Sequence, residues 1–256
     1  MGSGNQTRRA RGAVRVQARR VIKESWESQA NLSVFLALTV LVTFVLPVLG
    51  FGRDDLKLYA DVAYSLMLIS GVALAWGQTT LIVIAGLVGL LSVAVRWMNF
   101  FSPTTIDQVW ADLSSIAAIL VIGFILLLQV FRPGRVGHTR IQGAIAVYLI
   151  FGAAWAHAFH LIATLQPGSF NNALGPHSDV SEWIYYSYTT LSTLGYGDIT
   201  AVRPPARLLS VGEALTGQLY LAVLIARLVA MDVVDWQESH HDSSADSLQP
   251  EGNTGA

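Results

Sequence analysis

Six long apolar runs constrain the fold of this chain more than any other feature of its sequence. A transmembrane helix needs about 20 mostly apolar residues to cross the hydrocarbon core of a bilayer. The runs of this length are residues 31–50, 57–76, 79–98, 112–131, 141–165 and 206–231. Charged residues make up only 13% of the chain, which is about half their share in a soluble domain. We therefore expect an all-α integral membrane protein with six transmembrane helices.

Lysine and arginine are unevenly divided between the two sides of such a membrane. With a cytoplasmic N-terminus, eleven of the 16 basic residues lie inside and five lie outside. The positive-inside rule then places both termini in the cytoplasm of a multi-pass protein of the cell membrane. The basic N-terminal segment, 1–30, is either an ordinary topology signal or a helix that lies on anionic lipid. The acidic tail, 232–256, has the polar composition of a disordered segment.

A short polar stretch interrupts the apolar pattern between the fifth and sixth runs. Residues 181–190, SEWIYYSYTT, would be about 15 Å long as a helix, which is half the thickness of a membrane. Residues 191–198, LSTLGYGD, follow and contain two glycines. Non-helical backbone is tolerated at membrane depth only where protein or a water-filled cavity surrounds it. The pattern predicts a re-entrant loop, in which a short pore helix is followed by an extended return.

Within this loop, residues 193–198, TLGYGD, resemble the selectivity-filter motif of potassium channels, T-V/I-G-Y-G-D. Glycine reaches φ > 0 without steric cost, so Gly195 and Gly197 suit a backbone whose alternating handedness turns successive carbonyls toward one axis. The resemblance implies a K⁺-selective channel, with K⁺ as the permeant ion and the filter as its binding site. The K⁺ ligands that it implies are the backbone carbonyls of Thr193, Leu194, Gly195 and Tyr196, with the Thr193 hydroxyl closing the inner site.

The same resemblance implies roles for residues around the motif. Tyr196 would point away from the ion and brace the filter against the pore-helix residues Tyr185 and Tyr186. Asp198 would lie at the extracellular mouth. The pore helix would aim the negative end of its dipole, around Thr190, at the cation.

The sequence departs from the family pattern at two positions of the loop. Leu194 stands where the family usually has Val or Ile; its carbonyl is the ligand, so selectivity should survive, with looser packing of the filter. Thr189 stands where some members carry a glutamate that pairs with the filter aspartate. That carboxyl pair is absent here, and Thr189 is a candidate for filter support of another kind.

The sixth run follows the filter and should line the inner cavity. Gly217 lies 20 residues after Gly197, a separation that resembles the spacing of the hinge glycine in the family. Close packing against a neighbouring helix explains a glycine here equally well. Glu213 is a carboxylate within a span, which is costly unless it is paired or hydrated. We expect it either to support the filter from behind, with Arg207 or a pore-helix hydroxyl as partner, or to lie at the membrane interface.

Histidines in and after the fifth run are candidate pH sensors. His157 and His160 share a helix face because they are three residues apart. They suit either a titrating pair or neutral side chains packed against the pore helix. His177, in the following loop, is a third candidate. The fifth run has no acidic residue beside them, so no metal site is predicted.

Six spans with a filter loop between the fifth and sixth is the layout of voltage-gated channels. Residues 31–131 would form a four-helix region, and residues 141–231 the pore domain with its outer helix, pore helix, filter and inner helix. A voltage sensor needs a row of basic residues in the fourth span, and none lies between Ala111 and Phe131. We therefore expect weak or no voltage sensitivity. One chain has one filter loop and a ring around an ion needs four, which predicts a homotetramer.

Two other transport functions remain open at this stage. A weakly selective monovalent cation channel fits if Leu194 and Thr189 reduce the rigidity of the filter. An ion-transporter subunit fits less well, because potassium transporters related to channels usually have four such loops per chain. No phosphate loop, zinc motif or nucleophile elbow occurs between the runs, so we predict no enzyme activity, no cofactor and no nucleic-acid partner.

Overall fold

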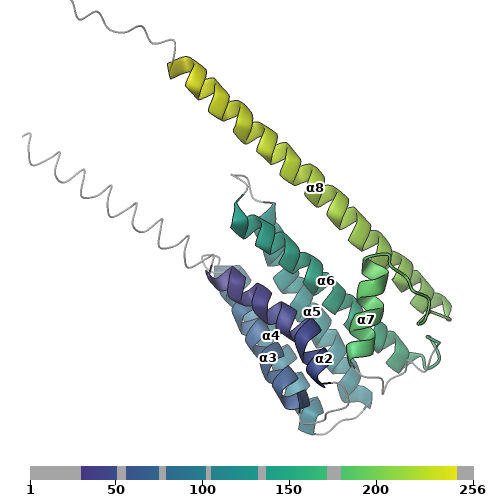
Figure 1. Cartoon of the computed structure of the whole chain (residues 1–256). Helices are drawn as coiled ribbons and strands as arrows, with labels where there is room; N and C mark the ends of the chain where they lie inside the picture. The colour runs from purple at the N-terminus through teal and green to yellow at the C-terminus, as the bar shows by residue number, and fades with distance from the viewer. Residues whose placement is uncertain are drawn as a thin grey trace, which may run out of the picture.

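The computed structural model of the chain describes residues 30–50, 56–74, 79–101, 105–131, 137–171 and 180–246, and most of this backbone is helical (Figure 1). The first helix includes the span Ala30–Leu49; it contains the π-helical turn η1 (Leu41–Val45) and ends with α2 (Leu46–Gly50). The helices that follow are α3 (Leu56–Ala73), α4 (Thr79–Phe101), α5 (Thr105–Val130), α6 (His138–Leu165), α7 (Val180–Leu191) and α8 (Pro204–Asp246).

Five of the described helices are long and apolar enough to cross a membrane. They are Ala30–Leu49, Thr79–Phe101, Ile106–Val130, Thr139–Leu165 and Pro204–Ala230. The predicted run 57–76 corresponds to α3, whose apolar part, Asp61–Ala73, is too short by the same measure. The structure therefore supports a helical membrane protein with several spans, and a sixth crossing stays a prediction.

A proline accompanies the irregular turn in the first helix. Pro47 has no backbone N–H, and its ring crowds the carbonyl four residues earlier. The backbone N–H of Leu46 donates to the carbonyl of Leu41, five residues back, which is the hydrogen bond of a π-helix. The bulge lies beside α7, where the ring of Phe44 is 5.0 Å from the ring of Tyr188. The first helix thus contacts the short helix that precedes the candidate filter.

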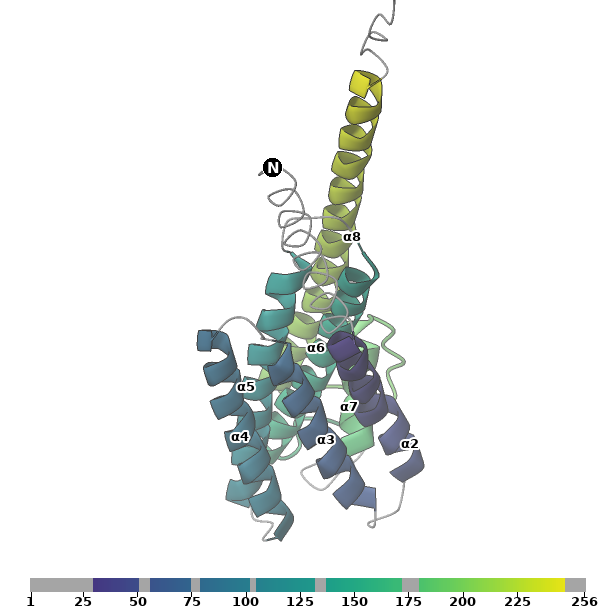
Figure 2. The same ribbon diagram turned by 90° about the vertical axis from the view of Figure 1, so that its left-hand side faces the viewer.

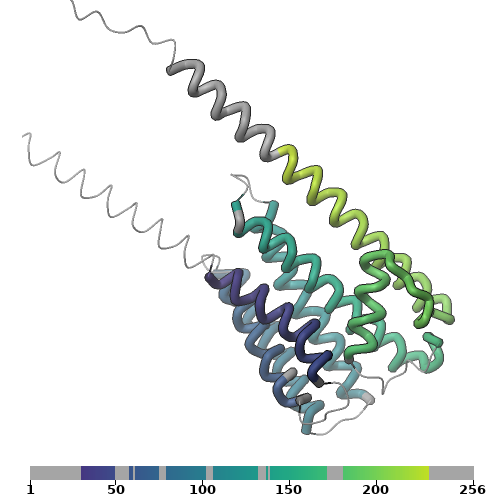
Figure 3. Tube along the Cα trace, viewed as in Figure 1, coloured from purple at the N-terminus to yellow at the C-terminus, as the bar shows by residue number. Residues whose placement is uncertain are grey.

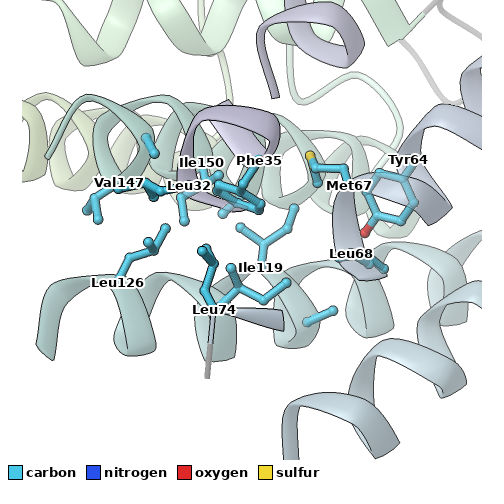
Figure 4. Packing of buried hydrophobic residues seen from close by; sticks show 14 of the residues in the cluster. Leu32, Phe35, Tyr64, Met67, Leu68, Leu74, Ile119, Leu126, Val147 and Ile150 are labelled. Carbon is cyan, nitrogen blue, oxygen red and sulfur yellow. The ribbon is translucent and has the colours of Figure 1, made fainter. Parts of the chain in front are cut away.

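The main hydrophobic core lies where the first helix, α3, α5 and α6 meet (Figure 4). Its buried members include Leu32 and Phe35 of the first helix, Met67 and Leu68 of α3, Ile119 and Leu126 of α5, and Val147 and Ile150 of α6. Gly71 on α3 permits a close approach, because a Cβ there would lie 2.7 Å from Cδ1 of Ile122. Helices in lipid gain little from the hydrophobic effect against one another, so close packing of this kind stabilises the bundle.

The short helix α7 lies between α6 and α8 (Figure 1, Figure 2). It has 12 residues, and a helix of that length is about 18 Å long, too short to cross a membrane. After α7 the chain turns back toward the end of the bundle at which α7 begins, and it then enters α8 (Figure 3). This path places the residues of the candidate filter along the side of α7.

Helix α8 is longer than the sixth predicted run. It continues to Asp246, and the disordered tail that composition indicates from residue 232 stays a prediction. No glycine or proline lies in residues 232–246, and a helix that already exists is extended without a new nucleus. Residues 247–256 and the basic segment up to residue 29 lie outside the described residues.

Candidate functional site

The backbone of residues 193–197 alternates in handedness. The angle φ is positive at Thr193 (58°), Gly195 (52°) and Gly197 (80°), and it is not positive at the intervening Leu194 and Tyr196. Glycine adopts positive φ at no steric cost, so the conformation expected of both glycines is confirmed. A threonine with positive φ costs about 1 kcal/mol or more, and persists only where its surroundings hold it.

Hydrogen bonds from α7 hold this segment. The backbone N–H of Thr193 donates to the carbonyl of Thr190 at 2.9 Å. The N–H groups of Leu194 and Gly195 donate to the carbonyl of Thr189 at 2.8 and 3.2 Å. The acceptors belong to the last turn of α7, where helix carbonyls have no partner within the helix. The loop thus caps the helix, and the helix end fixes the start of the loop.

The carbonyl oxygens of residues 193–197 accept no hydrogen bond from any described residue. The side chains of Leu194 and Tyr196 are 55% and 68% exposed. A Cβ at Gly195 or Gly197 would meet nothing within 4 Å. Polar backbone groups need a partner, and a dehydrated cation accepts several carbonyl oxygens as ligands. The carbonyls of this segment lie on an open part of the chain and are available to a ligand.

Tyr185, Tyr196 and Asp198 contact one another beside this segment. The rings of Tyr185 and Tyr196 are stacked, with centroids 6.4 Å apart and an interplanar angle of 3°. The Tyr185 hydroxyl donates to Oδ2 of Asp198 at 2.8 Å. This hydrogen bond lowers the pKa of the Asp198 carboxyl below its ordinary value and raises the pKa of the Tyr185 phenol. The contact expected between Tyr196 and Tyr185 is present.

Tyr186 does not occupy the place expected for it beside Tyr196. Its hydroxyl forms a hydrogen bond of 2.7 Å with Oγ of Ser210 on α8. Its buried ring packs edge-on against Phe159 of α6 and against Phe170. Neighbouring residues of a helix point about 100° apart, so Tyr185 and Tyr186 cannot share one partner. Tyr186 instead fixes α7 between α6 and α8.

A short antiparallel bridge joins the loops before α7 and after the candidate filter. It pairs Phe170 with Ala201. The N–H of Asn171 donates to the carbonyl of Thr200 at 3.0 Å, and that of Val202 donates to Ser169 at 2.8 Å. The far end of the filter segment is therefore tied to the end of α6.

Ser187 of α7 contacts two other helices. Its Oγ lies 2.7 Å from the carbonyl oxygen of Gly152 in α6 and 2.5 Å from Oε1 of Glu213 in α8. Ser187 and Glu213 are fully buried. Glu213 therefore has the pore-helix hydroxyl as its partner, and its depth in the membrane stays a prediction. Arg207, the other expected partner, donates to the carbonyl of Ala201.

Two glycines let α7 approach its neighbours. A Cβ at Gly217 of α8 would lie 2.1 Å from the carbonyl oxygen of Leu191, the last residue of α7. A Cβ at Gly152 of α6 would lie 2.5 Å from Cζ of Tyr188. Helix α8 passes through Gly217 without a break. The structure favours the packing explanation for Gly217, and a hinge there stays a prediction.

Gln218 is a residue that sequence reasoning missed. It follows Gly217 on α8, and its Nε2 donates to the Thr193 hydroxyl at 3.3 Å. A glutamine beside a glycine has no distinguishing pattern in a single sequence. Its relevance appears only when the fold brings α8 alongside the first residue of the loop, 25 positions away.

His157 and His160 share a partner that sequence reasoning also missed. Their Nδ1 atoms lie 2.9 and 2.6 Å from the two carboxylate oxygens of Asp112, which is buried in α5. The ring of His160 also packs 5.7 Å from that of Trp183 on α7, as expected of a histidine facing the pore helix. Among the described residues no group of three His, Cys, Asp or Glu could hold a metal ion. His177 lies outside the described residues.

Arg96, which looks isolated in the sequence of the third run, is paired in the fold. Its Nε donates to Oδ1 of Asp61 on α3, and its guanidinium carbon lies 4.5 Å above the ring of Tyr64. The cation is thus neutralised by a neighbouring helix within the bundle.

The fold and this loop define the class of the protein as a helical membrane protein with a short helix and a non-helical loop between its last two long helices. Residues 144–231, which contain most of α6, α7, the loop and much of α8, match the profile of a family described as "Ion channel". The chain is also 34% identical over 107 residues to Two pore potassium channel c of Oryza sativa subsp. japonica. Together the two matches support the potassium channel family, as the TLGYGD motif indicated.

The second match is partial on both sides. It covers 42% of this chain and 21% of the rice protein, so the chain spans about a fifth of the length of that relative. No solved structure matches this chain.

Proposed function

We propose that this chain is the subunit of a potassium-selective channel, which conducts K⁺ passively through backbone carbonyls of residues 193–197. The observation that carries the proposal is the alternating backbone of this segment, with φ positive at residues 193, 195 and 197. Its amides bond to the end of α7, and its carbonyls accept nothing from the described residues. Thr193, Leu194, Gly195 and Tyr196 would supply the ligands, because rings of carbonyl oxygens replace the hydration shell of K⁺.

The proposed ion pathway requires a homotetramer. One chain offers a single row of carbonyls on an exposed edge, and a ring around an ion needs four such rows. Several apolar side chains of α8 are also exposed in the single chain, among them Leu215, Leu219 and Val223. Three further copies would surround the filter and leave the remaining apolar surface to lipid.

The charge asymmetry of the sequence supports a cell-membrane protein with both termini in the cytoplasm. In this orientation α7 and the loop enter the membrane from outside, Asp198 lies at the outer mouth, and α8 lines the inner cavity. Six crossings are required, with α3 as the second. At about 27 Å for its 18 residues, α3 is close to the roughly 30 Å of a hydrocarbon core.

Voltage sensing is not part of the proposed function. Helix α5 has no basic residue within its membrane part, and Arg96 of α4 is paired with Asp61. A charge that crosses the field contributes about 2.3 kcal/mol per 100 mV, and no row of such charges is present in α5. We expect a nearly flat open probability between about −100 and +100 mV; a steep rise on depolarisation would contradict this.

Flux from liposomes tests the assignment of the filter. Purified protein should release K⁺ down its gradient, and Gly195→Ala should abolish most of that flux because alanine at φ 52° is strained. Gly86→Ala is the matched control, since Gly86 lies on α4 with nothing within 4 Å of its Cβ position. Unchanged flux in Gly195→Ala would refute the assignment.

A weakly selective cation channel is the second candidate. The observation that favours it is the exposed Leu194 at a position where the family usually has Val or Ile. The same liposomes loaded with Na⁺ distinguish the two, because a weakly selective pore would release Na⁺ at a similar rate.

A further inference from the structure

The contacts of Ser187 determine where a buried proton must lie. The Ser187 Oγ is 2.7 Å from the carbonyl oxygen of Gly152 and 2.5 Å from Oε1 of Glu213. A hydroxyl carries one proton, and a backbone carbonyl is an acceptor only. Two short contacts between oxygen atoms need two protons. Ser187 supplies one of them, so the carboxyl of Glu213 must supply the other.

The surroundings of Glu213 fit a carboxyl that is not ionised. Its side chain is fully buried within the membrane part of α8, and its Oε2 has no hydrogen-bond partner among the described residues. Among the described residues, the titratable groups that interact with it are three phenols, Tyr148 on α6 and Tyr186 and Tyr188 on α7. None of the three carries a positive charge. An ionised carboxylate buried without a cation is far more costly than a neutral acid.

We propose that Glu213 is a protonated, neutral carboxylic acid that donates a hydrogen bond to Ser187, which in turn donates to the carbonyl of Gly152. This relay makes Glu213 a positioning residue for the filter, and it rests on the proposed function of the chain as a channel. It connects the inner helix α8, the pore helix α7 and the outer helix α6 through neutral groups alone.

A second contact between α7 and α8, one helical turn after the relay, explains how the relay can position the filter. Glu213 and Gly217 are four residues apart on α8, and their partners Ser187 and Leu191 are four apart on α7. The two pairs fix the register of the C-terminal turn of α7 against α8. The carbonyl of Thr189, in that turn, holds the amides at the start of the filter. A shift of α7 along α8 would therefore displace the carbonyls that bind K⁺.

Infrared spectroscopy of the full-length protein in lipid tests the proton directly. At neutral pH the wild-type spectrum should contain the C=O band of a protonated carboxylic acid, and Glu213→Gln should remove it. Glu182→Gln, which removes an exposed carboxyl at the start of α7, is the matched control and should leave the band in place. A band that survives in Glu213→Gln would overturn the proposal. This readout does not depend on conduction, so it stands even if the proposed channel function fails.

Ion flux then tests the positioning role. Glutamine retains a neutral donor, so Glu213→Gln should keep the K⁺ over Na⁺ preference of the wild type. Glu213→Ala and Ser187→Ala each lose the link to α7, and each should lower that preference by about tenfold, which corresponds to one hydrogen bond. A Glu213→Gln channel as poorly selective as Glu213→Ala would show that the negative charge matters, and would overturn the role proposed for the neutral acid.

Discussion

At the scale of single residues, the candidate site depends on three residues with positive φ, namely Thr193, Gly195 and Gly197. Thr193 holds a positive φ because α7 accepts its N–H and Gln218 contacts its hydroxyl. Gly195 and Gly197 hold theirs without strain. The selectivity proposed for the channel therefore depends on backbone shape, and side chains act by holding that shape.

Gly217→Ala tests the packing of α7 on α8. The added Cβ would lie 2.1 Å from a backbone oxygen that cannot rotate away, so one helix must move. We expect a loss of about 1–3 kcal/mol of stability, as for other overpacked sites, with reduced K⁺ flux. Thermal unfolding in detergent measures the first effect, with Gly86→Ala as the control. A melting temperature equal to that of the control would contradict the packing.

Tyr185→Phe tests the contact at the outer mouth. The Tyr185 hydroxyl lowers the pKa of Asp198, so the contact stabilises the native state above the ordinary pKa of an aspartate and is lost as the pH falls through the lowered pKa. Removal of the hydroxyl should shift protonation of Asp198 to higher pH. External acidification should then reduce the K⁺ current of the variant at a higher pH than in the wild type. Identical pH curves would show that the contact is absent in the membrane.

At the scale of elements, α5 and α6 are joined by the Asp112 carboxylate, which contacts His157 and His160. Asp112→Ala should leave two half-buried ring nitrogens without the carboxylate that they contact. We expect a loss of about 1–3 kcal/mol of stability, measured by thermal unfolding in detergent. Ser114→Ala, which removes a hydroxyl that bonds only to its own helix, should cost less. Equal effects of the two substitutions would argue against the Asp112 contacts.

The helices and the filter motif could be predicted from the sequence because both depend on local patterns. The apolar runs predicted the five helices that are long and apolar enough to cross a membrane. The aromatic stretch 181–190 predicted α7 to within one residue at either end. The two glycines of the motif indicate positive φ because glycine has no Cβ. Each of these inferences needs only neighbours in sequence.

Contacts between distant segments could not be predicted in this way. Asp112 lies 45 residues from His157, and Gln218 lies 25 residues from Thr193, so neither pair forms a local pattern. The length of α8 could not be predicted from the polar composition of residues 232–246, because a helix that already exists is extended without a new nucleus. Glu213 is intermediate: a carboxylate within an apolar run drew attention, and only the fold identifies Ser187 as its partner.

At the scale of the whole molecule, the open edge of residues 193–197 is incomplete in one chain. Native mass measurement in mild detergent should give a particle of four times the 27.7 kDa of the chain. Cross-linking should produce the corresponding ladder of two, three and four chains. A stable monomer under these conditions would contradict the tetrameric pore.

The reversal potential of the purified protein in a planar bilayer tests the central claim most directly. With equal concentrations of K⁺ on one side and Na⁺ on the other, each tenfold preference for K⁺ moves the potential by about 59 mV. A K⁺-selective filter of backbone carbonyls predicts a reversal potential displaced by more than one such step toward the K⁺ equilibrium. A reversal potential at zero would contradict it.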